Sequence, residues 1–187
     1  MEFSNTIQAM QNLGKAVVEE GKLILATNKP YPKTTSKNTL YNDFSYTVTT
    51  DSDNVELEWS FGNAEDYWRF VDEGVKGSGK PDKNGYLVPG SLRGVGSPFS
   101  YSNKMPPRRA IDKWVVSKPL KAARDKKGKF IKRKSLVFFI QRSIFQRGLQ
   151  RTQFFTKPYN DQLNKNIDII TEAFAEDLEL QIENLLK

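Results

Sequence analysis

Residues 44–61 read FSYTVTTDSDNVELEWSF, and this stretch decides the fold class. Apolar and polar side chains alternate over residues 44–48 and again over residues 55–61. Such alternation is typical of strands that turn one face to a core and the other to water. The intervening residues 51–54, Asp-Ser-Asp-Asn, are types that favour a turn. The stretch therefore predicts an antiparallel β-hairpin.

Outside the hairpin the periodicity is helical, with apolar residues three and four positions apart. It predicts a last helix beyond Asn160 and four earlier helices, over residues 5–26, 64–74, 107–117 and 132–147. We therefore expect an α+β fold with an N-terminal helix, a small antiparallel β-sheet packed by helices, a long Gly/Pro-rich arm and C-terminal helices. The 187 residues are expected to form a single domain, 1–187, in which residues 160–187 are an acidic C-terminal helix.

The predicted arm, residues 75–107, is rich in glycine, proline and serine. A stretch of this length without regular structure is uncommon inside a compact domain and is usually functional or disordered. The arm nevertheless carries apolar side chains that could be buried, namely Tyr86, Leu87, Val88, Leu92, Phe99 and Tyr101. We expect these side chains to contact a neighbouring subunit, and residues 76–106 to become ordered only on assembly.

The chain contains no histidine and no cysteine. This composition excludes Ser-His-Asp triads, cysteine nucleophiles, disulfides and zinc sites built on those residues. Adjacent carboxylates such as Glu19 and Glu20 point in different directions on a helix, so they form no acid–base pair. We expect no catalytic site, no metal site and no cofactor. No apolar run approaches the ~18 residues of a membrane-spanning helix, and the first residues do not resemble a signal peptide.

The net charge of +7 is unevenly distributed. Residues 104–151 hold sixteen Lys or Arg residues and two acids, whereas residues 160–187 hold seven acids and two lysines. Three interpretations are open: the basic segment contacts phosphate, it contacts acidic surfaces of neighbouring subunits, or it is a solvated loop.

The candidate site within the basic segment is a cluster that faces either DNA or another subunit. Its members are Arg108, Arg109, Arg124, Lys126, Lys127, Lys129, Lys132, Arg133 and Lys134. Residues 132–134 begin a predicted helix, where the helix dipole disfavours cations. This placement favours an anionic partner, and either a phosphate or the acidic tail of a neighbour would serve.

Four short motifs occur in a fixed order around these elements. They are YPKTTSKNTL at 31–40, YWRFVDEGVKG at 67–77, RDKKGKF at 124–130 and FFTKPY at 154–159. Together with the order of the helices and the hairpin, they resemble the neck, or tail-completion (head–tail joining), proteins of tailed bacteriophages. The similarity covers residues 30–187. The chain departs from the pattern at Lys37-Asn38, where Thr-Gly is common, and in the length of the arm.

The resemblance implies a non-enzymatic virion protein, assembled in the host cytoplasm, that forms a homo-oligomeric ring between the head connector and the tail. Its partners would be other neck, connector and tail proteins and phage DNA in the lumen, with no membrane contact. The alternative is a soluble basic nucleic-acid-binding protein that uses residues 104–134. A third class, a nuclease or a lysozyme-like hydrolase without histidine, has no recognisable carboxylate pair to support it.

Overall fold

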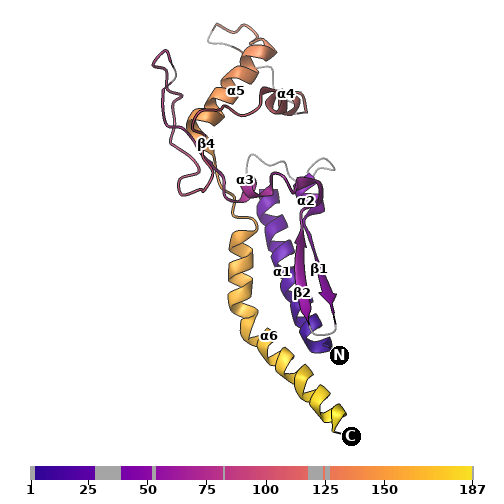
Figure 1. Cartoon of the computed structure of the whole chain (residues 1–187). Helices are drawn as coiled ribbons and strands as arrows, with labels where there is room; N and C mark the ends of the chain where they lie inside the picture. Colours follow the sequence, from indigo (N-terminus) through magenta and orange to yellow (C-terminus); the bar gives the residue numbers. More distant parts are fainter. Residues whose placement is uncertain are drawn as a thin grey trace. The chain divides into compact units, whose positions relative to one another are not determined.

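The computed structural model describes residues 3–27, 39–51, 54–81, 83–117, 124 and 127–186. Over these residues the fold is α+β, as predicted, with six α-helices and two small antiparallel sheets of two strands each (Figure 1). Contacts divide the chain into two compact units, which the sequence had not indicated. Unit 1 comprises Met1–Asp72 and Thr152–Lys187, and unit 2 comprises Glu73–Arg151. Unit 2 is thus an insertion in the chain of unit 1.

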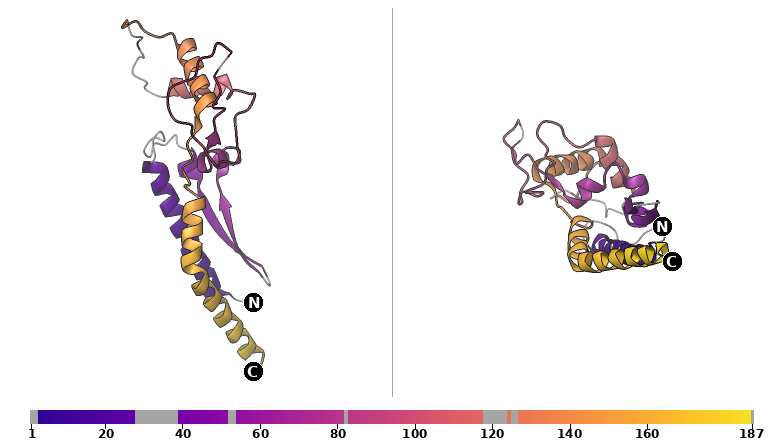
Figure 2. Two further views of the ribbon diagram at one scale, coloured as in Figure 1. Left: turned by 90° about the vertical axis from the view of Figure 1, so that its left-hand side faces the viewer. Right: turned by 60° about the horizontal axis from the view of Figure 1, so that its bottom comes forward.

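Unit 1 is built around helix α1 (Ser4–Thr27). One side of α1 packs along the long helix α6 (Thr156–Leu185), which runs antiparallel to it (Figures 1 and 2). Another side packs on the hairpin of β1 (Ser45–Thr50) and β2 (Val55–Ser60). A short helix, α2 (Thr39–Asp43), leads into the hairpin.

The hairpin confirms the alternation read from the sequence. Its antiparallel register pairs Tyr46 with Trp59 and Val48 with Leu57, so the apolar residues share one face. These side chains are half-buried, whereas the intervening residues, among them Glu56 and Glu58, are exposed. The apolar face is the one that packs on α1.

Three buried phenylalanines form the centre of the unit 1 core. The ring of Phe44 stacks on Phe61 at 5.2 Å between centroids and meets Phe154 edge-on at 5.5 Å. Two glycines let α1 approach the hairpin and this cluster. A Cβ atom at Gly14 would lie 2.3 Å from the ring of Tyr46, and one at Gly21 would lie 2.7 Å from Phe44 and from the Phe154 carbonyl. The close packing of α1 therefore depends on both glycines.

Two buried aspartates cap helices that are distant in sequence. Asp177 of α6 accepts hydrogen bonds from the backbone N–H groups of Asn5 (3.1 Å) and Thr6 (2.8 Å) in the first turn of α1, and from the Thr6 hydroxyl (2.7 Å). Asp72 accepts from the N–H groups of Phe155 (2.8 Å) and Thr156 (3.3 Å) at the start of α6. Both carboxylates thereby satisfy N–H groups that the helices themselves cannot.

The helix expected over 64–74 is shorter in the structure. A 3₁₀ turn (Gly62–Ala64) is followed by α3 (Trp68–Asp72). The tight turn returns the chain so that Trp68 stacks on Phe61, with centroids 4.1 Å apart. Gly74, with φ of 71°, then ends the element, as the sequence indicated.

Unit 2 contains a two-stranded ladder and a pair of helices. Strand β3 (Val75–Lys76) pairs antiparallel with β4 (Gly148–Leu149). Helix α4 (Arg108–Ser117) packs on α5 (Arg133–Arg147) through a small core of Ile111, Val115 and Val137. Both helices begin within one or two residues of the predicted starts.

The arm, 75–107, folds within unit 2 on the C-terminal end of α5. The side chain of Gln146 is buried and pairs with the arm backbone: its Oε1 accepts from the N–H of Val88 at 2.7 Å, and its Nε2 donates to the carbonyl of Tyr86 at 2.9 Å. The backbone of Lys76 also bonds to Phe99 (2.8 Å) and Tyr101 (2.9 Å). The arm, whose apolar side chains were expected to contact a neighbouring subunit, is thus held in part through its backbone by its own unit.

Candidate functional site

The two units carry opposite charge. Unit 1 contains 9 Lys or Arg residues and 18 Asp or Glu residues, whereas unit 2 contains 20 and 4, which gives net charges of −9 and +16. The uneven distribution read along the sequence is therefore a separation between two folded bodies. Surfaces of opposite sign favour association of one molecule with another and steer the encounter.

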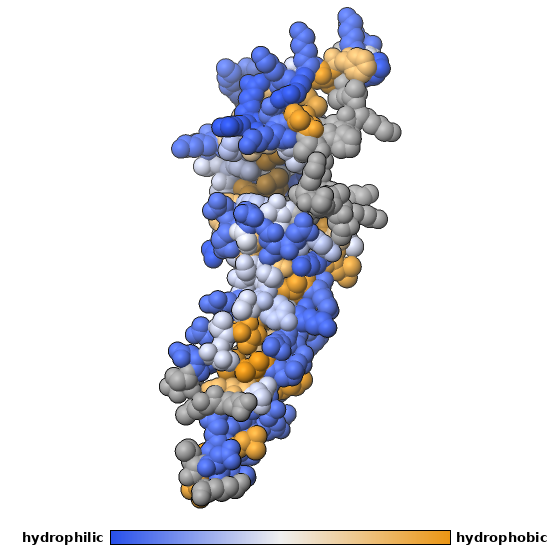
Figure 3. All heavy atoms as spheres, turned by 90° about the vertical axis from the view of Figure 1, so that its right-hand side faces the viewer, coloured by the Kyte–Doolittle hydropathy of each residue, from blue (hydrophilic) through white to orange (hydrophobic). Residues whose placement is uncertain are grey.

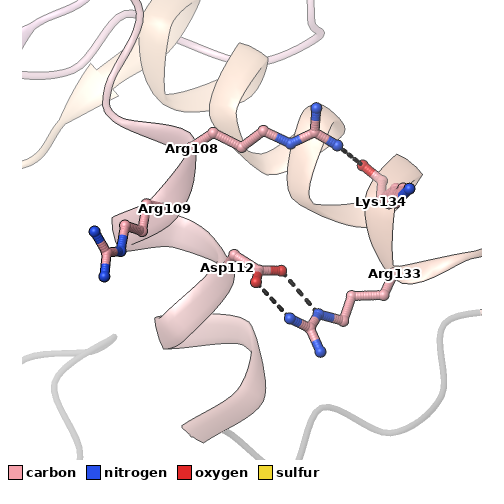
Figure 4. Close-up of a pocket in the computed structure, with 5 residues that line it drawn as sticks. All are labelled: Arg108, Arg109, Asp112, Arg133 and Lys134. Atoms are coloured by element: carbon pink, nitrogen blue, oxygen red, sulfur yellow. Dashed lines mark hydrogen bonds and ion pairs between the residues drawn. The ribbon is translucent and has the colours of Figure 1, made fainter.

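Four basic residues of unit 2 lie close together where α4 and α5 begin. They line an open pocket of about 740 Å³ whose walls are Arg108, Arg109, Asp112, Arg133 and Lys134 (Figure 4). Arg133 forms a two-pronged ion pair with Asp112, in which its Nε donates to Oδ1 at 2.8 Å and its Nη2 donates to Oδ2. Arg108 donates to the backbone carbonyl of Lys134 at 3.4 Å, while Arg109 points away from the ion pair.

Asp112 partly neutralises this pocket. The hydrogen bond from Arg133, aided by the charges of Arg133 and Arg108, holds the pKa of Asp112 below its usual value. The sequence predicted an anionic partner for residues 132–134. For Arg133 that partner is Asp112 of its own unit. For the side chains of Lys132 and Lys134, the described part of the chain supplies no hydrogen bond or ion pair.

Charges at three helix ends are unfavourably placed with respect to the helix dipoles. The first turns of α4 and α5 contain no acidic residue, although they carry Arg108, Arg109, Arg133 and Lys134. At the other end of the chain, the last turn of α6 contains no basic residue but does contain Glu183. Cations at helix N-termini and anions at helix C-termini are each disfavoured by the helix itself. Such placement indicates that the charges serve a contact outside their own helix.

The end of α6 projects beyond the helix it packs on. Because Asp177 caps the first turn of α1, residues 178–186 continue past that turn as an overhang (the yellow end in Figure 1). The overhang exposes Leu178 (37%), Leu180 (53%), Ile182 (57%) and Leu186 (81%) to solvent. Glu179 and Glu183 lie exposed between them. The surface is therefore both apolar and acidic.

Unit 2 exposes a surface of the complementary kind. Phe138 and Phe139 on α5 are 43% and 52% exposed. Phe138 lies one turn after Lys134, so the two side chains are neighbours on the helix. Figure 3, which shows one face of the molecule, likewise has apolar side chains (orange) reaching the surface among polar ones (blue).

The nine predicted basic residues do not form one cluster. Arg108, Arg109, Arg133 and Lys134 line the pocket, and Lys132 immediately precedes α5. Arg124 belongs to a separate turn, where its guanidinium lies 4.0 Å from the ring centroid of Phe130 and donates to the Gly128 carbonyl at 2.8 Å. Lys127 and Lys129 are exposed in that turn. Lys126 lies outside the described residues.

The predicted arm residues also divide. Val88, Phe99 and Tyr101 are half-buried within unit 2, whereas Tyr86, Leu87 and Leu92 are exposed. The guanidinium of Arg142 lies 4.3 Å from the ring centroid of Tyr86, which shows that this exposed ring is nevertheless held against α5. Sequence reasoning missed Gln146 and Asp112. Two features of the sequence could have indicated them: Gln146 is a polar residue in an apolar helix, and Asp112 is the single acid of helix 107–117.

Among the described residues no group of three or more acidic side chains gathers that could hold a metal ion. Within the same part of the chain, no helix combines the length and apolar character needed to cross a membrane.

Comparison of the chain with protein-family models, with curated proteins and with solved structures finds no match.

Proposed function

We propose that the chain is a structural subunit of the neck of a tailed bacteriophage, where copies of it form a ring between the head connector and the tail. The observation that carries this proposal is the pairing of two unlike surfaces on one chain. One is the acidic, apolar overhang of unit 1, and the other is the basic, apolar surface of unit 2. Two different but complementary patches make head-to-tail contacts, and such contacts close into a ring where the rotation between neighbours allows it.

Three observations favour an assembling protein over a monomeric one. Large apolar side chains are exposed in both units, and clusters of that kind mark sites of association. The arm adds three exposed large side chains, Tyr86, Leu87 and Leu92. The motif resemblance to neck proteins then supplies the setting, a virion ring through which DNA passes, and the net charge of +16 on unit 2 suits contact with that DNA.

The test is the oligomeric state of the purified chain and its position in particles. Native mass spectrometry over a range of protein concentrations should show one defined oligomer. Electron microscopy of virions should place the chain in the neck. A chain that stays monomeric at high concentration and low salt, and is absent from particles, would rule the proposal out.

A second candidate function is nucleic-acid binding by unit 2 alone, which its net charge of +16 favours. Titration with duplex and single-stranded DNA at two salt concentrations tests it, because phosphate contacts give affinities that fall steeply with salt. A monomer that binds DNA with such dependence would favour this function over the ring.

A further inference from the structure

Two helix ends in this chain carry charges that destabilise their own helices. Lys132 and Lys134 lie at the N-terminal end of α5, and Glu179 and Glu183 lie near the C-terminal end of α6. All four side chains are exposed. Reversing the sign of the two lysines, or of Glu183 in the last turn of α6, would suit the helix dipole better. An opposite charge from outside the helix would therefore stabilise each of these two helix ends.

We propose that these two ends meet each other between copies: the α6 overhang of one copy docks on the N-terminal half of α5 in the next copy. This contact rests on the proposed function, because it presumes that the chain forms a homo-oligomer. Glu179 and Glu183 approach Lys132 and Lys134 of the neighbour, so the unfavourable dipole interaction of each helix end is offset by an opposite charge.

The apolar side chains beside these charges match in the same way. On the overhang, Leu178 and Ile182 are one turn apart and form a stripe next to the similarly spaced Glu179 and Glu183. On α5, Phe138 follows Lys134 by one turn. The contact thus has an apolar centre and a charged border, which is the usual anatomy of a protein interface.

The contact is heterologous, since the two surfaces belong to different units of the chain. Each copy therefore offers a free overhang to one neighbour and a free α5 end to the other. Repetition of one such contact builds a ring or an open helix, according to the rotation it imposes.

Two charge-reversed variants test the contact. In the first, Glu179→Lys and Glu183→Lys, the overhang becomes basic; in the second, Lys132→Glu and Lys134→Glu, the α5 end becomes acidic. Each variant places like charges at the contact. We expect the protein concentration needed for half-assembly to rise about tenfold or more in both. Both reversals favour the helix dipoles, so circular dichroism should show fully folded chains.

The decisive sample is an equimolar mixture of the two variants. A basic overhang then meets an acidic α5 end, and the unchanged overhang meets the unchanged α5 end, so the two variants alternate in even-numbered rings or in open chains. We expect the mixture to assemble at nearly the wild-type concentration, as measured by sedimentation velocity on nuclease-treated protein. The matched controls are Glu56→Lys with Glu58→Lys on the hairpin and Lys80→Glu with Lys83→Glu on the arm, and each should assemble by itself at nearly the wild-type concentration.

Each outcome has one meaning. Two weakened variants whose mixture assembles support the contact. Two weakened variants whose mixture stays dissociated show that the surfaces do not meet each other, which overturns it. Variants that assemble like the wild type also overturn it and leave the ring proposal standing. A wild-type chain that does not assemble removes the ring proposal, and the contact with it.

Discussion

Asp177 joins helices α6 and α1, because its carboxylate bonds to Thr6, a residue 171 positions earlier in the sequence. Its side chain is 1% exposed and its carboxylate accepts three hydrogen bonds from Asn5 and Thr6. Burial alone would raise the pKa of Asp177, but these hydrogen bonds outweigh burial and hold the pKa below its usual value. The carboxylate therefore belongs to the folded state in its charged form.

Removal of this cap should destabilise unit 1. In Asp177→Ala, two N–H groups of the first turn of α1 and the Thr6 hydroxyl lose their acceptor. We expect the free energy of unfolding at pH 7 to fall by about 1–3 kcal/mol, measured by denaturant titration. Glu172→Ala, at an exposed position of the same helix, is the control and should change stability by less than about 0.5 kcal/mol.

The same cap predicts a dependence on pH. Since folding lowers the pKa of Asp177, its contribution is fully present above the unfolded pKa of about 3.9 and is lost as the pH falls through the folded value. The wild type should therefore lose more stability than Asp177→Asn between pH 6 and the acid range, because the amide does not titrate. Equal slopes for the two chains in a stability–pH plot would contradict this assignment.

Gln146 has the corresponding role in unit 2. Its buried amide bonds to the arm backbone at Tyr86 and Val88. In Gln146→Ala both arm groups lose their partner, and trypsin should cut the isolated chain after Lys83 several times faster than it cuts the wild type. Gln150→Ala, an exposed neighbour of α5, should leave the cleavage rate unchanged.

At the scale of the elements, the glycines of α1 reverse the usual rule of helix propensity. A glycine within a helix normally costs about 0.5–1 kcal/mol relative to alanine. At Gly21, however, a Cβ atom would lie 2.7 Å from both Phe44 and the Phe154 carbonyl. We expect Gly21→Ala to lower the free energy of unfolding by about 1–3 kcal/mol in thermal or chemical denaturation. Gln11→Ala, at an exposed site of α1, tests propensity alone and should be neutral or slightly stabilising.

Periodic patterns within a segment predicted most of the helices and the hairpin. They could not predict contacts between residues that are distant in the sequence. The hairpin, α1, α4 and α5 follow from periodicities within each segment. The ion pair of Arg133 with Asp112 spans 21 residues, and the bond from Val88 to Gln146 spans 58. Neither contact produces a periodic pattern in the sequence, because its partners come together only when separate elements pack. For the same reason, the basic cluster read from the sequence separates into a pocket and a turn.

At the scale of the whole molecule, folding and assembly should be separable. Truncation after Asp177 removes the overhang but keeps the cap on α1 and the packing of α1 on α6. We expect the shortened chain to remain folded by circular dichroism and to sediment as a monomer at concentrations where the full chain assembles. Loss of the folded signal would instead show that residues 178–187 stabilise unit 1 itself.

The chain leaves unit 1 after Asp72 and returns at Thr152, and these two points are bonded to each other. The N–H of Thr152 donates to the carbonyls of Val71 and Asp72, both at 3.1 Å, and the N–H of Gln153 donates to Asp72 at 2.9 Å. The two ends of the 79-residue insert therefore lie side by side, and we expect a short linker between Asp72 and Thr152 to replace the insert without unfolding unit 1. Evolution could therefore exchange the insert, unit 2, at this one position while the acidic unit 1 stays the same.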